Sequence, residues 1–235
     1  MTALLQVEDL AASYGQLQAV RGVSFDVAAG ESLVVIGENG AGKTTLFHSL
    51  AGLHGAARGK VMLGGEDLGA VPAHARVGRG IALVPEGRRI FPSLSVDENL
   101  RVAEDQLRQR RPRRWTRERV YGLFPDLRAA ADRGGHQISG GQQQMLAIGR
   151  ALLSEPRVLL VDEVSLGLSP AMVQVVYQAL AAIRGDGVTL VFVEQDVQRG
   201  VASSDHLVCL HKGSVRLAAS SREVTLDEVR RAYFG

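Results

Sequence analysis

The stretch VVIGENGAGKTTLF, residues 34–47, joins a short apolar run to a glycine-rich turn and then to the start of a helical pattern. The turn matches G-x-x-x-x-G-K-[ST] at Gly37, Gly42, Lys43 and Thr44. Glycines let successive backbone N–H groups point into one concavity, and the helix that follows adds its positive end. The stretch therefore predicts a site for the phosphates of a nucleoside triphosphate.

Two side chains of this turn have predicted roles of their own. Lys43 is expected to reach the outer phosphates, and the Thr44 hydroxyl is expected to ligate Mg²⁺. The other predicted nucleotide contacts are Gly37, Glu38, Asn39, Gly40, Ala41, Gly42 and Thr45.

Apolar runs alternate with helical patterns over most of the chain, which predicts an α/β fold around a mainly parallel sheet. Short alternating runs within residues 4–27 add an N-terminal antiparallel sheet. Buried strands are predicted at 32–36, 158–162 and 188–194, helices at 43–53, 142–153, 170–184 and 228–233, and a closing hairpin at 206–219.

Residues 95–133 have helical periodicity and dense charge, which indicates an inserted helical subdomain. A chain of 235 residues with 46% hydrophobic content can bury the core of one such domain. We expect a single domain, with the core and β-subdomain at about 1–90 and 155–235 and the helical subdomain at about 91–154.

Composition excludes several classes of function. The formal net charge of +2 gives no strong attraction to nucleic acid. Cys209 is the only cysteine, so an internal disulfide is excluded and a reducing compartment is favoured. No uncharged apolar stretch approaches the roughly 20 residues of a membrane helix, so we expect no bilayer span. The six histidines show no metal-binding spacing.

A second apolar strand ends in Asp162 and Glu163. An aspartate at that position can hold Mg²⁺ through water, and an adjacent carboxylate can polarise the water that attacks a γ-phosphate. The pair therefore favours hydrolysis over transfer to a metabolite, although solvated acids at a strand end are also common.

The segment ISGGQQQMLAIGRAL, residues 138–152, predicts a second anion site at a helix start. The same residues are ordinary in a helix cap. Together with Tyr14 and the P-loop (Gly37–Thr45), this segment resembles the signature of the ATP-binding cassette family, over essentially the whole chain. The resemblance implies a RecA-like P-loop NTPase fold, and an ATPase that works as a head-to-tail pair of cassettes. Ser139, Gly140, Gly141 and Gln142 would then contact ATP held by the partner's P-loop.

The resemblance also assigns Tyr14 to stacking on adenine, with an edge-strand aromatic as the alternative. The chain contains one cassette and no sustained heptad pattern. In this respect it is similar to the separate ATPase subunit of a prokaryotic importer. The motifs LVPEGRRIFPSLSVDENL, SLGLSP and VRRAYFG resemble the smaller ATPase of branched-chain amino-acid importers. This implies a second ATPase subunit, permease subunits and, indirectly, an extracytoplasmic binding protein, with the chain at the cytoplasmic face of the membrane. The permease is expected near Arg88–Leu94.

Four positions depart from the usual cassette pattern. Glu86 replaces a glutamine that senses the γ-phosphate and Mg²⁺, and Gln195 replaces the switch histidine. Ser169 replaces an aspartate, and Val164 replaces the proline after Asp162–Glu163, from which we expect a looser turn. Catalytic roles are carried over to Lys43, Glu163 and Gln195, and a metal role to Glu86. The hypothesis that follows is an asymmetric heterodimer in which the chain's own site turns over more slowly.

Other interpretations stay open at this point. The arginine run at residues 108–119, with Trp115 among it, fits a solvated helical face or contact with lipid headgroups. A GTPase lacks support, because neither Asn39 nor Asn99 lies in a guanine-reading Asn-Lys-x-Asp element. Urea or a short amide as the solute, and a cassette that regulates without transporting, are the remaining alternatives.

Overall fold

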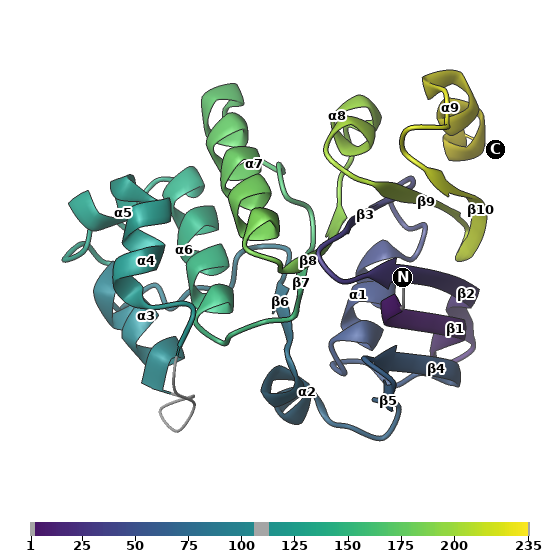
Figure 1. The fold of residues 1–235 in the computed structure, drawn as a ribbon, viewed down its shortest axis with the longest axis horizontal. Coiled ribbons are helices and arrows are strands. Elements are labelled where there is room, and N and C mark those ends of the chain that lie inside the picture. The colour runs from purple at the N-terminus through teal and green to yellow at the C-terminus, as the bar shows by residue number, and fades with distance from the viewer. Residues whose placement is uncertain (1–2, 106–112, 235) are drawn as a thin grey trace.

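A computed structural model describes residues 3–105 and 113–234, and its strands form two sheets (Figure 1). The larger has the order β10-β9-β3-β8-β7-β6, in which every pair is parallel except β10 with β9. Its strands are β3 (Ser32–Ile36), β6 (Ile81–Val84), β7 (Val158–Val161), β8 (Thr189–Val193), β9 (His206–His211) and β10 (Ser214–Ser220). The predicted mainly parallel core is confirmed.

The smaller sheet is antiparallel, with the order β2-β1-β4-β5. Its strands are β1 (Ala3–Tyr14), β2 (Leu17–Ala28), β4 (Arg58–Leu63) and β5 (Glu66–Asp67). Leu5 of β1 pairs with Val27 of β2 on one side and with Leu63 of β4 on the other, so β1 lies between two strands of this sheet. The predicted N-terminal antiparallel sheet is confirmed.

Alternate residues of the parallel strands enter two different hydrophobic cores. In β3, Val34 and Ile36 belong to one core, and Leu33 and Val35 belong to the other. A strand that is covered on both faces needs apolar residues throughout, which is why the central strands read as uninterrupted apolar runs. The second core also contains α1 (Lys43–Leu50), which lies between the two sheets.

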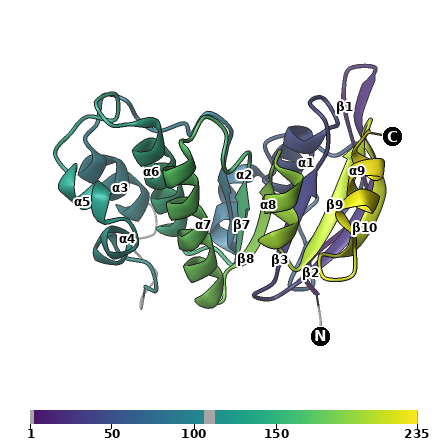
Figure 2. The ribbon, with the colours of Figure 1, turned by 90° about the horizontal axis from the view of Figure 1, so that it is seen from above.

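Helices cover both faces of the larger sheet. Figure 2 shows α7 (Pro170–Gly185) and α8 (Val197–Ala202) on the side opposite α1. The C-terminal helix α9 (Leu226–Phe234) packs on β9 and β10. Because helices cover both faces of the larger sheet, a ligand site is expected in the loops that follow the carboxyl ends of β3, β7 and β8.

A group of helices extends beyond the β6 edge of the larger sheet (Figure 1). Its members are α3 (Val96–Asp105), α4 (Arg117–Leu123), α5 (Pro125–Ala129) and α6 (Gly140–Leu152). Trp115 and Phe124 are fully buried within it, so Trp115 is a core residue rather than a headgroup-facing aromatic. The subdomain boundaries predicted near residues 91 and 154 stay a proposal.

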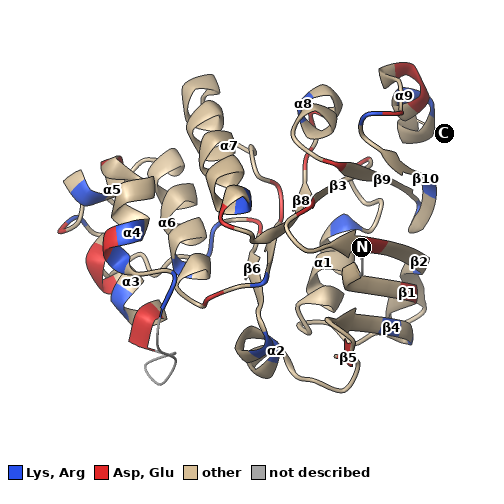
Figure 3. Ribbon diagram, viewed as in Figure 1, with Lys and Arg blue, Asp and Glu red and all other residues tan. Residues whose placement is uncertain are grey.

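Among the described arginines of the 108–119 run, Arg113, Arg117 and Arg119 make ion pairs. Arg117 pairs with Asp97 and Glu104, and Arg119 pairs with Asp186 and stacks on Trp115. Figure 3 shows the acidic residues of α3 beside the basic residues of α4. These contacts favour a solvated, internally paired face over lipid contact. Residues 108–112 of the run lie outside the described residues.

Two short helices were missed by the sequence reasoning, α2 (Ala73–Arg79) and α8. The helix predicted at 43–53 ends at Leu50, where buried Arg76 of α2 donates to the carbonyl oxygens of Ser49 and Leu50, both at 2.8 Å. A guanidinium satisfies these last carbonyls, so the chain leaves the helix earlier than its apolar pattern predicts.

Candidate functional site

The P-loop connects β3 to α1 and has little room for side chains. A Cβ on Gly37 would lie 2.3 Å from the Leu210 carbonyl oxygen, and one on Gly42 would lie 2.3 Å from that of Ala19. Gly40 and Gly42 have φ values of 81° and 100°, in the region that favours glycine. Only glycine fits the two ends of this turn, which keeps its backbone N–H groups turned inward.

Lys43 extends from the first turn of α1 back over the P-loop. Its Nζ donates to the carbonyl oxygens of Gly37 at 2.7 Å and Glu38 at 3.0 Å. The side chain is almost fully buried, and this burial lowers the pKa of Lys43, while Glu163, Asp162 and Glu86 act in the opposite direction. The ammonium is thus already desolvated at the place where phosphate oxygens would arrive.

Asp162, directly after β7, is buried with both carboxylate oxygens lacking a hydrogen-bond partner within the described residues. Burial raises the pKa of Asp162 to about 6; the nearby Thr44 side chain and Lys43 oppose the shift, and Glu163 and Glu86 add to it. Two orphaned oxygens beside a hydroxyl fit a hydrated Mg²⁺, which usually takes only one or two protein carboxylates. Over the described ranges, no cluster of three or more His, Cys, Asp or Glu residues is arranged as a metal site.

Glu163 has a backbone φ of 56° and faces the switch residue. The Gln195 amide Nε2 donates to both of its carboxylate oxygens at 2.9 Å. Val164 does not loosen this turn, contrary to the sequence expectation. Its N–H donates to the Val193 carbonyl at 3.2 Å, a bond that proline could not make, and its side chain is fully buried.

A cleft of about 400 Å³ brings the predicted catalytic residues Lys43, Glu163 and Gln195 together with part of the predicted P-loop site. It is lined by P-loop residues and by Glu86, Glu163 and Gln195. Ala19 and Leu166 also line it, and sequence reasoning had not assigned them to the site. Of the cleft-lining residues, Lys43 is the only cation.

Ser139, Gly140, Gly141 and Gln142 do not line this cleft. They begin α6 as a capping box, in which Ser139 Oγ accepts from the Gln142 N–H at 3.2 Å and Gln142 Oε1 accepts from the Ser139 N–H at 3.0 Å. Ser139 is exposed. These residues therefore have the ordinary role of a helix cap, and Ser139 is exposed to solvent at the start of the helix.

Tyr14 also lies outside the cleft lining, at the end of β1. Its side chain is 52% exposed, and its ring packs on His54 with the ring centroids 4.3 Å apart. His54 is held in turn by a 3.1 Å hydrogen bond between Nε2 and the Ser13 carbonyl oxygen. Ser169 has a local role, since its Oγ accepts from the Met172 N–H and caps α7.

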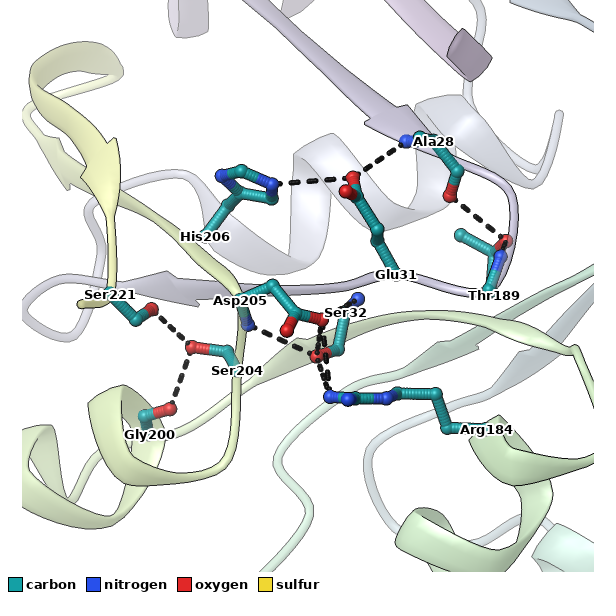
Figure 4. Close-up of polar contacts among 11 residues, drawn as sticks. Ala28, Glu31, Ser32, Arg184, Thr189, Gly200, Ser204, Asp205, His206 and Ser221 are labelled. Atoms are coloured by element: carbon teal, nitrogen blue, oxygen red, sulfur yellow. Dashed lines mark hydrogen bonds and ion pairs between the residues drawn. The ribbon is translucent and has the colours of Figure 1, made fainter. Parts of the chain in front are cut away.

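Another cavity, of about 690 Å³, lies between α7, β8, α8 and the segments that precede β9 and follow β10. Its charged and hydroxyl groups bind one another: Arg184 pairs with Asp205 at 3.1 Å, and Ser204 contacts Ser221 at 2.8 Å (Figure 4). Asp205 also accepts from the N–H and the hydroxyl of Ser32 at the start of β3. This network lies at the amino end of the parallel strands, away from the cleft.

Comparison with known proteins decides the family. A model described as ABC transporter matches residues 20–165, which include the P-loop, the ISGGQ segment and Asp162–Glu163. The chain belongs to this family. It is therefore an ATP-binding cassette ATPase, as the resemblance implied.

Relatives match this cassette along its whole length. The high-affinity branched-chain amino acid transport ATP-binding protein BraG of Pseudomonas aeruginosa is 38% identical over 233 residues, covering 99% of the chain and 100% of BraG. The lipopolysaccharide export system ATP-binding protein LptB of Acidithiobacillus ferridurans is 33% identical, covering 100% and 98%. A solved nucleotide-free ATP-binding cassette from an ABC transporter shares the fold, with a TM-score of 0.85 and 23% identity over the full length of both chains.

No helix within the described residues is long and apolar enough to cross a membrane. Together the fold, the cleft and the family establish a transporter ATP-binding subunit.

Proposed function

We propose that this cassette hydrolyses ATP to power an importer of branched-chain amino acids. The observation that carries the proposal is the gathering of Lys43, Glu163 and Gln195 around one cleft, above the orphaned Asp162 carboxylate. The choice of solute is supported by the full-length similarity to BraG, which exceeds the similarity to LptB.

In this proposal the P-loop holds the triphosphate through its N–H groups and Lys43. Thr44 would hold Mg²⁺ with its hydroxyl, Asp162 and Glu86 would hold it through water, and the ion would neutralise charge on the phosphates. Exposed Glu86 carries a negative charge toward the cleft, so its contact with phosphate has to be indirect.

Glu163 is proposed to orient and deprotonate the attacking water. Gln195 positions the Glu163 carboxylate with its amide and donates a hydrogen bond to phosphate, without the charged state that a histidine could reach. The water oxygen forms a bond to the γ-phosphorus while its proton goes to Glu163, and the bond from this phosphorus to the β–γ bridging oxygen breaks, so that ADP is the leaving group and phosphate is the second product.

Ser139 to Gln142 are proposed to contact ATP bound by a second cassette, which is most simply a different chain. The support is that Ser139 is exposed and that the helix start it caps lies outside the chain's own cleft. A helix N-terminus with a hydroxyl and two glycines suits phosphate oxygens. ATP would then join two subunits, and hydrolysis would release them.

The permease is proposed to dock at a groove of about 310 Å³ between α2, β6, α3 and α6, beside residues 88–94. Apolar residues such as Val102 and Ala103 line it together with Arg88, Arg89 and Arg150. Arg150 lies over the ring of Phe91, which is 41% exposed. This surface suits a short cytoplasmic segment with apolar and acidic residues, and docking there would put the cassette at the cytoplasmic face of the membrane.

Filling the groove should detach the permease. We expect Ala103→Trp to reduce the permease that co-purifies by about tenfold, which corresponds to ~1.4 kcal/mol. Ala181→Trp is the matched control, because Ala181 is also helical and lines the other cavity. Normal recovery with Ala103→Trp, measured by quantitative blotting of membrane extracts, would place the docking site elsewhere.

Tyr14, whose ring packs on the ring of His54, is proposed to stack on adenine. We expect Tyr14→Ala to weaken ATP binding by roughly tenfold, since a stacked base contributes about 1–3 kcal/mol. Tyr14→Phe should bind normally, and inorganic tripolyphosphate should bind all three proteins equally. Equal ATP affinity of the alanine variant in calorimetry would instead support an edge-strand aromatic.

The solute is tested with the complete transporter and its binding protein in proteoliposomes. We expect ATP-dependent uptake of leucine, isoleucine or valine, in preference to urea and short amides. Uptake of urea alone would correct the solute and keep the importer. Extraction of lipopolysaccharide without any uptake would favour an exporter, as the LptB relative allows. A chain that never fractionates with permease subunits would support regulation without transport.

A further inference from the structure

Glu194 is a buried carboxylate beside the proposed catalytic residues, and the roles assigned so far do not use it. It follows β8 directly and is only 1% exposed. Its Oε1 accepts from the N–H groups of Gln195 at 2.9 Å and Asp196 at 3.0 Å, and from the Ser165 hydroxyl at 2.8 Å. Its Oε2 accepts from the Tyr177 hydroxyl at 2.5 Å.

The bond from Ser165 joins two loops that leave the sheet from neighbouring strands, and the bond from Tyr177 ties Glu194 to α7. Residues 163–165 follow β7, and residues 193–196 end β8 and continue from it. Two further contacts link these segments: the Val164 N–H donates to the Val193 carbonyl, and the Gln195 amide donates to Glu163.

The chemistry of the carboxylate explains why a charged residue is kept there. Four donors surround Glu194, and bonds to an ionised acceptor are shorter and stronger than neutral ones. Burial, and then the charge of Glu194, raises the pKa of Tyr177, so that this phenol remains a donor. A buried carboxylate with every donor in place fixes the backbone of both loops at once.

We propose that Glu194 is a positioning residue for ATP hydrolysis, which holds the Gln195 backbone so that the Gln195 amide keeps Glu163 in its working orientation. The inference rests on the proposed roles of Glu163 and Gln195. Neither the P-loop nor Lys43 bonds to Glu194, so ATP binding should not depend on it.

The test is steady-state ATP hydrolysis by the purified chain together with the subunits that accompany it. Glu194→Ala should lower kcat about tenfold and leave KM for ATP within about twofold, because the residue orients and does not bind substrate. Glu194→Gln should recover most of kcat, since an amide oxygen can still accept the three Oε1 bonds. Ser165→Ala, which removes one of those bonds, should lower kcat about threefold.

A double-mutant cycle distinguishes positioning from general destabilisation. Glu194→Ala combined with Gln195→Ala should hydrolyse ATP no more slowly than Gln195→Ala alone, because both act along one path. Asp205→Ala is the matched control, since Asp205 also accepts two hydrogen bonds and makes one ion pair, but at the other end of the strands (Figure 4). It should lower Tm and leave kcat within about twofold.

Four results would overturn the inference: an unchanged kcat for Glu194→Ala, effects that multiply in the cycle, an equal loss of kcat in Asp205→Ala, or, if Glu194→Ala does not fold, an unchanged kcat for Ser165→Ala. If Glu163→Gln and Gln195→Ala themselves keep normal kcat, the proposed catalytic roles fail first, which is a different outcome.

Discussion

Replacing Lys43 with alanine is expected to weaken ATP binding by roughly 30- to 150-fold, the equivalent of about 2–3 kcal/mol for a lost bond to a charged group. Lys43 is the only cation among the described residues that line the cleft. Its ammonium is already buried and held at the P-loop by two carbonyl oxygens, so little reorganisation precedes contact with phosphate. Hydrolysis should fall further, by about 10²–10³, because charge on the phosphates increases in the transition state.

The chain offers a close control for this experiment. Lys60 is an exposed lysine on β4, outside the cleft lining, and Lys60→Ala should bind and hydrolyse ATP normally. Binding is measured by calorimetry, and folding by thermal melting. A Lys43→Ala protein that melts normally and binds ATP with unchanged affinity would contradict the assignment of the cleft as the nucleotide site.

The features that the sequence predicts well are those that depend on neighbours along the chain. The run 33–36 is apolar throughout because β3 is buried on both faces, and the glycines after it are required by the close approach of two carbonyl oxygens. At these positions the local sequence pattern and the tertiary packing require the same residue types, so the fold class and the P-loop can be predicted from the sequence.

The features that it misses depend on partners far away in the chain. Arg76 lies in another helix about 26 residues after Leu50 and donates to the Leu50 carbonyl oxygen at the end of α1. The sequence pattern near Leu50 does not indicate this contact. Val164 was expected to loosen its turn, but its N–H finds a partner on β8, a strand that only the sheet order brings alongside. Glu194 had one signal, an acidic residue directly after a buried strand and next to Gln195, which resembles the signal that identified Glu163.

Glu163→Gln is expected to reduce ATP hydrolysis at the chain's own site by about 10²–10⁴ while ATP still binds there, since a general base contributes roughly that factor. The amide fits the same space but cannot take a proton from water, and Gln195 Nε2 can still donate to its oxygen. ATP that stays bound should then hold the two cassettes together. Light scattering should detect a dimer with ATP and Mg²⁺, once the companion cassette is present, and separate chains with ADP.

The same variant tests the asymmetric heterodimer. The tethered Val164 turn removes one reason to expect a slow site here, so the hypothesis now depends on Glu86 and Gln195. Glu86 brings a negative charge toward the phosphates, and Gln195 lacks a titrating ring. Glu163→Gln should therefore reduce solute uptake less than the equivalent change in the companion cassette. An equal or larger loss would show that both sites contribute alike, and an arrested protein that stays monomeric with ATP and its companion would exclude the role of Ser139–Gln142 in the neighbour's site.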